Sequence, residues 1–485
     1  MFLVFLGIFS YFTNPFVRFS LVKKPYEVVE DQNHQLIIEE KNALKIKRNF
    51  LSSDLAFAKA GYLIFTNRLL GSKQTAHKNV EEIIAEIHNL RFGQQNLFLI
   101  SGDHFSVLYP RSLGIFYHSL LDPRTALTIA DWRNRQQIYL QTLAYALAVF
   151  SSAHDLTTTI VPIGPQSVAL INFYSKPSDT LYSLLYGLRV TQTSADLIAT
   201  YPFSQPQLEL QTRTEAQELL FKYKNSLQEL LNNYTQTVLD PQTGLIKKNL
   251  LLSGTKDNAK RMSSFYDNVI FWATHVLAQQ LELEPSNKPY LDSLKQRIID
   301  TFWLPKEGYF LEDVSPQSRS QRHYSSDWLI AYMIGFLDPT NPVDREYLQR
   351  SIMYIKAQKL DQPFALKYQS DWQKEQQYLV VRLLAPSYGT KNIWSNWGME
   401  YTKLLLTLFQ QTCNQSYLHT AQSQVAAYTK NIEKYRGYPE VYDANGNIFS
   451  DLFYKSVRQT GWVVSFEEAR AMLNWTQANL PRCLF

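Results

Sequence analysis

The sequence predicts a mainly α-helical protein in which about six helical hairpins form a closed ring. Three observations lead to this fold class. Apolar residues recur at i, i+3 and i+4 spacing in about twelve separate segments. Breaks with turn chemistry, such as residues 240–244 (DPQTG), separate these segments. Stretches such as Leu143–Phe150 are apolar on all sides, which the buried inner helices of a ring require.

The expected helices lie near residues 54–71, 78–91, 105–121, 134–152, 214–238, 265–283, 287–303, 325–337, 343–358, 394–412, 416–432 and 460–478. Their number also fits an α-solenoid, but the chain contains no internal repeat of fixed period. We therefore expect residues 51–485 to form an (α/α)6 toroid with a small β-containing insertion and an N-terminal extension.

Three segments depart from this helical rhythm. Residues 1–24 are largely apolar but are interrupted by Asn14-Pro15 and Arg18, and the apolar run is too short to span a bilayer. Three interpretations are open for this segment: a membrane anchor, a signal remnant or an apolar element of the fold. We favour weak membrane association. The location of the protein, cytoplasmic or extracytoplasmic, stays open. Residues 25–50 alternate as a short β or extended leader. Residues 153–212 are rich in Thr, Ser and Pro, with strand-like pieces at 159–162 and 167–173, and predict an inserted excursion over the barrel mouth.

Composition excludes some classes of function. The 485 residues are 45% hydrophobic and 14% aromatic, which suits a large core and a sugar-binding site alike. The net charge of +5 is mild and dispersed, so nucleic acid is not an expected partner. Cys413 and Cys483 have no metal-ligand spacing and form no disulfide framework, so the redox compartment stays open.

The most informative segment is residues 437–446 (GYPEVYDANG), followed by Gln459-Thr460-Gly461-Trp462. It places a carboxylate, Glu440, behind a proline in a loop among tyrosines. Carbohydrate chemistry needs such a fixed carboxylate beside aromatic faces that stack on sugar rings. The alternative is a capping loop in which Glu440 favours a helix dipole.

This segment resembles the late catalytic-base loop of the six-hairpin (α/α)6 glycosidases, which include trehalases, glucoamylases and the processing α-glucosidase/mannosylglycerate hydrolase family. Their pattern is roughly Glu-x-Tyr-Asp, a glycine-bearing loop, and then Gln-x-Gly-x-Trp or a close variant. The resemblance covers roughly residues 100–478 and implies that Glu440 is the general base.

Hydrolysis of a glycoside usually needs a second carboxyl group. Asp267, Asn268 and Trp272 match the Asp-Asn-x-x-x-Trp acid motif of the mannosylglycerate hydrolase family, so the resemblance implies that Asp267 is the general acid. The chain departs from the family upstream, where Ser-Phe-Tyr replaces Ser-Gly-Trp. Asp267 also begins a helix, where a carboxylate is an ordinary favourable choice. Asp257 is the reserve acid.

Other positions fit a sugar site less specifically. Tyr109-Pro110-Arg111 resembles the early aromatic-Pro-Arg loop of these families, but Ser112 replaces the usual Asp, so the acid role there passes to Asp103. The further candidates for substrate binding are Tyr266, Asn268, Trp272, Asp327, Trp328, Trp394, Asn396, Tyr442, Gln459 and Trp462. Each aromatic residue alone is more often core. Their clustering at the starts of alternate helices favours a site at one face of the ring.

The resemblance implies an inverting, exo-acting hydrolase of an α-glucoside or related α-glycoside that uses no cofactor. Two other classes stay open: a glycan-binding or envelope-associated toroid that cleaves nothing, and a lyase or epimerase with His104, His118, His275 or His323 as base. No HExxH motif is present and the histidines are scattered, so no metal site is expected.

Overall fold

The computed structural model describes residues 28–30, 36–38, 61–71, 74–88, 91–92, 95–97, 107–126, 128–164, 167–172, 176–199, 206–371 and 376–479. The expected anchor at 1–24 lies outside these residues. Within the expected leader, β1 (Val28–Glu30) and β2 (Leu36–Ile38) pair antiparallel. No helix in the described part of the chain is both long and apolar enough to cross a membrane.

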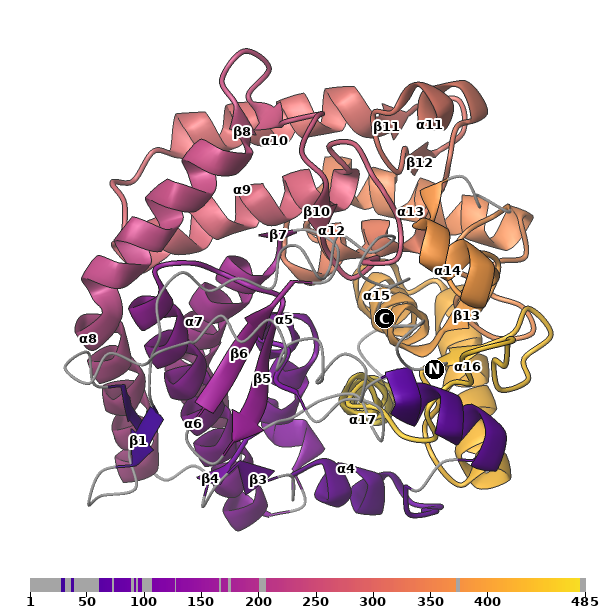
Figure 1. Ribbon diagram of the computed structural model, residues 1–485. Coiled ribbons are helices and arrows are strands. Elements are labelled where there is room, and N and C mark those ends of the chain that lie inside the picture. The colour runs from indigo at the N-terminus through magenta and orange to yellow at the C-terminus, as the bar shows by residue number, and fades with distance from the viewer. Residues whose placement is uncertain are drawn as a thin grey trace, which may run out of the picture.

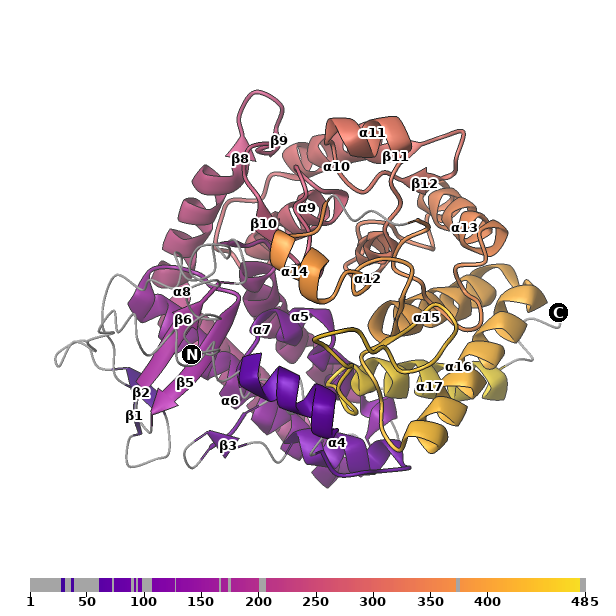
Figure 2. The ribbon, with the colours of Figure 1, turned by 45° about the vertical axis from the view of Figure 1, so that its right-hand side comes forward.

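An inner ring of six helical segments forms the centre of the molecule (Figures 1 and 2). Each segment contacts the next, and α17 closes the ring against η2. The segments are α5 (Arg111–Ile115) with η2 (Tyr117–Leu121), α7 (Thr180–Ala199), α9 (Phe265–Gln280), η4 (Ser326–Leu329) with α12 (Ile330–Met333), α15 (Ser395–Thr412) and α17 (Val463–Ala478).

An outer layer of antiparallel helices connects the inner ones (Figure 2). It consists of α6 (Ile129–Ala153), α8 (Pro206–Val238), α10 (Lys288–Phe302), α13 (Pro342–Ala357) and α16 (Gln415–Tyr435), with α4 (Val80–His88) packed on α17. The predicted (α/α)6 fold class is confirmed.

Burial patterns distinguish most helices of the two layers. Outer helix α6 is an exception, because it buries Leu143–Phe150 except for Ala144, so the expectation that this apolar stretch belongs to an inner helix is wrong. Inner helix α15 is buried without interruption from Ser395 to Leu406. Outer helix α10 buries only Leu294, Ile298, Ile299 and Phe302, which form one stripe. The α10 start is fixed by Asn287, whose side chain accepts a hydrogen bond from the Tyr290 amide at 3.1 Å.

The structure corrects the predicted extent of the insertion. Strands β5 (Thr159–Gly164) and β6 (Ser167–Ile171) form a hairpin where strand-like pieces were expected. Residues Thr180–Ala199, however, form the inner helix α7 rather than part of an excursion. A Cβ on Gly187 would lie 3.1 Å from the Tyr139 hydroxyl of α6, so this glycine permits close helix packing. The small residues that suggested an irregular segment therefore belong to a tight helix interface.

Other elements also differ from expectation. The helix expected at 325–337 is divided between η4 and α12, and Gly335 at φ +73° follows their end. Two short helices, α11 (Pro316–Gln321) and α14 (Leu379–Leu384), were not predicted. The remaining elements are η3 (Pro123–Thr125) and short strand pairs: β3 (Arg91–Phe92) with β4 (Gln95–Asn96), β7 (Lys176–Pro177) with β10 (Leu252–Ser253), β8 (Leu239–Asp240) with β9 (Leu245–Ile246), β11 (Trp303–Leu304) with β12 (Tyr309–Phe310), and β13 (Ile393–Trp394) with β14 (Val441–Tyr442).

A buried charge cluster joins three inner elements. Lys403 Nζ of α15 lies 2.9 Å from Glu400 Oε1 and 2.6 Å from Glu468 Oε2 of α17. The Ser119 hydroxyl of η2 also donates to Glu468, at 2.7 Å. Burial raises the pKa of Glu400 to about 7. Burial also opposes ionisation of Glu468, but the charges of Lys403 and His118 and the hydrogen bonds from Lys403 and Ser119 together lower its pKa to about 2.

The end of α15 carries a covalent link. Cys413 ends this helix in the left-handed conformation and is disulfide-bonded. The sequence contains one other cysteine, Cys483, which lies outside the described residues. The expectation that the two cysteines serve no disulfide is therefore wrong for Cys413.

Candidate active site

The N-terminal ends of the inner helices lie at the same end of the ring. Each hairpin returns the chain through an antiparallel outer helix, so successive inner helices run in the same direction. The loops before α5, α7, α9, η4, α15 and α17 therefore meet at one face (Figure 2). The candidate residues of the sequence analysis come from these loops and helix starts.

Glu440 lies in the loop between α16 and α17 and is partly buried. Its backbone carbonyl accepts hydrogen bonds from the Ser395 amide at 3.1 Å and the Ser395 hydroxyl at 3.0 Å, which fix the loop to the start of α15. Tyr388 donates to Oε1 at 3.3 Å and Tyr454 donates to Oε2 at 2.5 Å. Burial raises the pKa of Glu440 to about 7, and the charge of Asp257 adds to this rise.

Asp257 is therefore the carboxyl group that interacts electrostatically with Glu440. It lies in the loop before α9, and 29% of its side chain is exposed. Its Oδ2 is 3.7 Å from Nη1 of Arg111. Burial raises the pKa of Asp257 to about 6; Arg111 opposes this rise and Asp179 adds to it. Two carboxyl groups with raised pKa values thus lie near each other at the mouth of the ring.

Arg111 is held from several sides. Its Nη2 donates to the Ser253 hydroxyl at 3.2 Å, and its Nη1 donates to the Gly254 carbonyl. Its Nε lies 3.5 Å from Asp179 Oδ1, and Asp179 is fully buried at the start of α7. The other oxygen of Asp179 accepts a hydrogen bond from Tyr266 at 2.9 Å. This network orients the guanidinium toward Asp257.

Aromatic residues surround Glu440. Trp394 packs against Tyr388 at a centroid distance of 5.0 Å and against Trp462 at 5.6 Å. Tyr388 also packs edge-on to Tyr454 at 5.2 Å. Tyr109 is half-buried and lies near both Arg111 and Tyr454. Such rings can stack on the apolar faces of sugars.

A second set of charges lies beside Asp257 in the chain. Buried Lys256 pairs with Glu312, and buried Arg261 donates to Asp327 Oδ2 at 2.5 Å. Tyr368 also donates to Asp327, at 3.3 Å. Burial raises the pKa of Glu312 to about 7. Both cations are thus neutralised by carboxylates of neighbouring loops.

Asp267 has a different environment from Asp257. It is 1% exposed, its backbone amide donates to the Ser264 hydroxyl at 3.0 Å, and its Oδ2 accepts from the same hydroxyl at 2.6 Å. These contacts cap the start of α9. Asn268 is also a local anchor, because its Oδ1 accepts from the Ile246 amide at 2.9 Å and its Nδ2 donates to the Ser264 carbonyl.

Four predicted site residues lie close to Glu440 or Asp257 in the structure: Tyr109, Arg111, Trp394 and Trp462. Other predicted site residues pack against different parts of the fold. The Trp272 indole donates to the Leu291 carbonyl at 3.0 Å, and the Trp328 indole donates to Tyr324 at 3.1 Å. Tyr442 is fully buried and packs edge-on to Phe364, and buried Asn396 lies in the first turn of α15. The Gln459 amide donates to the Thr75 carbonyl. Asp103 lies outside the described residues.

The sequence analysis did not predict the contact of Asp179 with Arg111 or those of Tyr388 and Tyr454 with Glu440, and it treated Asp257 only as a reserve. One signal for Asp257 was present. The Ser-Gly pair expected before the acid is missing before Asp267 but stands as Ser253-Gly254 shortly before Asp257. No comparable signal marks Asp179, whose contact with Arg111 joins two different hairpins.

Within the described residues, no group of three or more His, Cys, Asp and Glu side chains could hold a metal ion.

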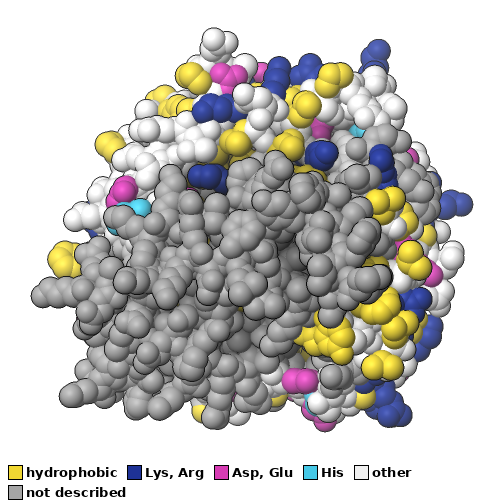
Figure 3. All heavy atoms as spheres, viewed as in Figure 1, with side chains coloured by type: hydrophobic (Ala, Val, Ile, Leu, Met, Phe, Trp, Pro, Cys, Tyr) yellow, Lys and Arg dark blue, Asp and Glu magenta, His cyan; other side chains and the backbone are white. Residues whose placement is uncertain are grey.

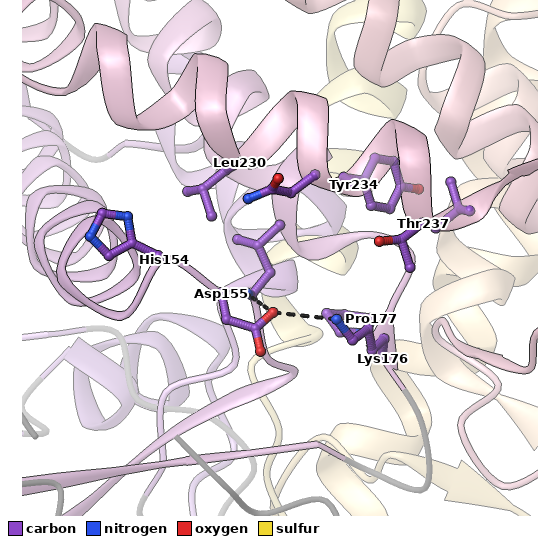
Figure 4. A pocket seen from close by; sticks show the side chains of 10 residues that line it. His154, Asp155, Lys176, Pro177, Leu230, Tyr234 and Thr237 are labelled. Atoms are coloured by element: carbon purple, nitrogen blue, oxygen red, sulfur yellow. Dashed lines mark hydrogen bonds and ion pairs between the residues drawn. The ribbon is translucent and has the colours of Figure 1, made fainter. Parts of the chain in front are cut away.

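A separate pocket lies between the end of α6 and α8, where Lys176 Nζ is 3.6 Å from Asp155 Oδ1 (Figure 4). Its lining shares no residue with the Asp257 and Glu440 group.

Two comparisons with known proteins find no match: no family model fits the chain, and no curated protein matches its sequence. Solved structures do match. A rhamnosidase from Klebsiella oxytoca with rhamnose bound has a TM-score of 0.50 at 13% identity, covering 83% of this chain and 63% of that one. A cellobiose 2-epimerase from Bacillus thermoamylovorans has 0.49 at 11% (85% and 98% covered), and a neutral trehalase from Saccharomyces cerevisiae has 0.47 at 11% (79% and 74% covered).

The chain therefore shares the helical-ring fold of the rhamnosidase. It spans 63% of the length of the rhamnosidase. At these identities the likeness concerns the fold alone.

Proposed function

We propose that the chain is a glycoside hydrolase in which Asp257 is the general acid and Glu440 is the general base. The observation that carries this proposal is the pair itself: two partly buried carboxyl groups at the mouth of the ring, each with a raised pKa, of which Asp257 raises the pKa of Glu440 further by its charge. The aromatic residues beside Glu440 support a sugar as the ligand.

In the proposed reaction, Asp257 gives its proton to the departing glycosidic oxygen as the bond to C1 breaks. Glu440 takes a proton from a water molecule, whose oxygen forms the new bond to C1. The products are a free sugar and the protonated leaving group, and proton exchange with solvent restores both carboxyl groups. We propose inversion, exo action and an α-glucoside or related α-glycoside, all of which follow from the family resemblance.

The surrounding charges favour a neutral sugar. Arg111, Lys256 and Arg261 are the buried cations of these loops, and each lies beside one or more carboxylates. An anionic substrate would have to compete with those partners. The acid role goes to Asp257 rather than Asp267 because Asp267 caps α9 and Asp257 interacts with Glu440.

The test is release of free sugar from a panel of α-linked disaccharides and oligosaccharides. Asp257→Asn and Glu440→Gln should each lower kcat/KM by about 10²–10⁴-fold on the substrate that the wild type cleaves. Asp267→Asn is the matched control and should keep activity in the folded fraction. Loss of activity in Asp267→Asn with an unchanged Asp257→Asn would refute the assignment, and binding of sugars without cleavage would favour a glycan-binding function.

The pH dependence gives a second test. The activity requires a protonated Asp257 and an ionised Glu440. Because the pKa of Asp257 is about 6 and that of Glu440 is about 7, this form is the less populated of the two singly protonated forms of the pair. The kcat/KM profile should therefore be bell-shaped, with its maximum between these values. A profile that stays flat from about pH 5 to pH 8 would contradict this.

A further inference from the structure

The helix at residues 61–70 lies outside the ring of six hairpins, beside the loop that contains Glu440 (Figure 1). It and residues 74–77 are called the brace below. The chain needs no such segment to close its ring, because α17 already contacts η2. Several contacts of the brace instead go to the loop between α16 and α17.

The brace contacts this loop near both ends. The His77 amide donates to the Arg436 carbonyl at 3.0 Å. At the other end, Gln74 Nε2 donates to the Gln459 carbonyl at 2.9 Å, and the Gln459 amide donates back to Gln74 Oε1 at 2.8 Å. Arg458 Nη1 donates to the Gln74 carbonyl at 3.1 Å.

The brace also contacts the middle of the loop. Arg68 Nε donates to the Asp451 carbonyl at 2.7 Å, and the Phe65 and Phe453 rings stack at 6.0 Å. Asp451 and Tyr454 close a tight turn, because the Asp451 amide donates to the Tyr454 carbonyl at 2.8 Å. Tyr454 is the residue whose hydroxyl donates to Glu440. The helix therefore holds the turn that presents this hydroxyl.

We propose that the brace is a positioning element that keeps the Tyr454 hydroxyl on Glu440, with Phe65 and Arg68 as its positioning residues. The proposal rests on the function proposed for Glu440. A donor on the carboxylate stabilises its ionised form, so losing the brace should leave more of Glu440 protonated at acid pH. The activity that needs an ionised Glu440 should then fall on the acid side of the optimum and stay unchanged on the alkaline side.

The test compares Phe65→Ala, Arg68→Ala and the reference Tyr454→Phe. Leu70→Ala is the matched control, because Leu70 is on the same helix and is 82% exposed. Apolar side chains gather where this helix lies, beside the grey region of Figure 3. Titration of the Glu440 carboxyl carbon by ¹³C NMR, assigned with Glu440→Gln, reports the effect without turnover.

The Tyr454→Phe change should raise the pKa of Glu440 by up to about one unit and lower acid-side kcat/KM by up to about tenfold. Phe65→Ala and Arg68→Ala should also raise the pKa of Glu440 and lower the acid-side kcat/KM, each by a smaller amount. Leu70→Ala should change neither quantity. A brace variant that unfolds more easily but keeps the wild-type Glu440 titration would overturn the proposal. If the wild type cleaves no glycoside, the proposed function fails, while the titration still decides the role of the brace.

Discussion

Replacing Lys403 with methionine should destabilise the protein strongly, because two carboxylates depend on this ammonium group. The side chains of Lys403 and Glu400 are 5% and 1% exposed, and that of Glu468 is 15% exposed. Removing one partner of a buried ion pair typically costs about 3–5 kcal/mol, since a charge is left without compensation. Two carboxylates are affected here, so we expect a loss of about 4 kcal/mol at pH 8.

The loss should depend on pH. In the wild type, Glu468 has a lowered pKa of about 2, so its pairing stabilises the fold at neutral pH and is lost only as the pH falls toward that value. Glu400 has a raised pKa of about 7, so its contribution is greatest at low pH and declines as the pH rises through 7. Without Lys403 both pKa values rise, and the difference from the wild type should be larger at pH 8 than at pH 5.

The assay is urea unfolding followed by circular dichroism at both pH values. Lys288→Met is the matched control. Lys288 Nζ lies 2.6 Å from Asp292 Oδ2, the same distance as from Lys403 Nζ to Glu468 Oε2, but the side chains of Lys288 and Asp292 are 81% and 61% exposed. Its unfolding midpoint should stay close to the wild-type value. A second change, Glu468→Gln, should recover part of the stability lost in Lys403→Met. The reasoning is refuted if Lys403→Met unfolds at the same midpoint as Lys288→Met at pH 8.

Two further predictions concern the site and the ring. Asp179→Asn removes a negative charge that raises the pKa of Asp257, so kcat/KM should fall on the alkaline side of the optimum and not on the acid side; a pH profile of the folded variant checks this. Gly398→Ala should cost about 1–3 kcal/mol in urea unfolding, because its Cβ would lie 2.2 Å from the Ala365 carbonyl oxygen. Gly61→Ala, with no atom within 4 Å of its Cβ, should stay within about 0.5 kcal/mol of the wild type; equal effects of the two glycine changes would contradict the packing argument.

The hydrophobic period of the sequence predicts most helices of the ring. It was overlooked at α7, where Leu181, Leu184, Leu185 and Leu188 recur at helical spacing and are buried, because the Thr, Ser and Pro residues of segment 153–212 suggested an irregular insertion. Gly187 permits close contact of this helix with Tyr139 and Leu143 of α6. The sequence of one helix does not show which neighbouring helix packs closely against its glycine.

The candidate site was predictable in part. Glu440 and Arg111 follow from motifs, because loop chemistry and family patterns are local in sequence. The partner of Arg111 is Asp179, from another hairpin, and the hydroxyls on Glu440 come from Tyr388 and Tyr454 in two separate loops. The contacts of Arg111 with Asp179 and of Tyr388 with Glu440 join different loops and form only in the folded chain, whereas Tyr454 lies in the same loop as Glu440. Asp257 itself carried a local signal, the preceding Ser-Gly pair, which the stronger match at Asp267 obscured.

The central claim is the division of roles between Asp257 and Glu440, and the dependence of the rate on the leaving group tests it most directly. A glycosyl fluoride needs little help from a general acid, whereas a sugar leaving group needs a proton. Asp257→Asn should therefore lose about 10²–10⁴-fold in kcat/KM on a disaccharide but much less on the fluoride, and Glu440→Gln should lose activity on both. If Asp257→Asn loses the same factor on both substrates, or if Asp267→Asn alone shows the selective loss, the central claim is wrong.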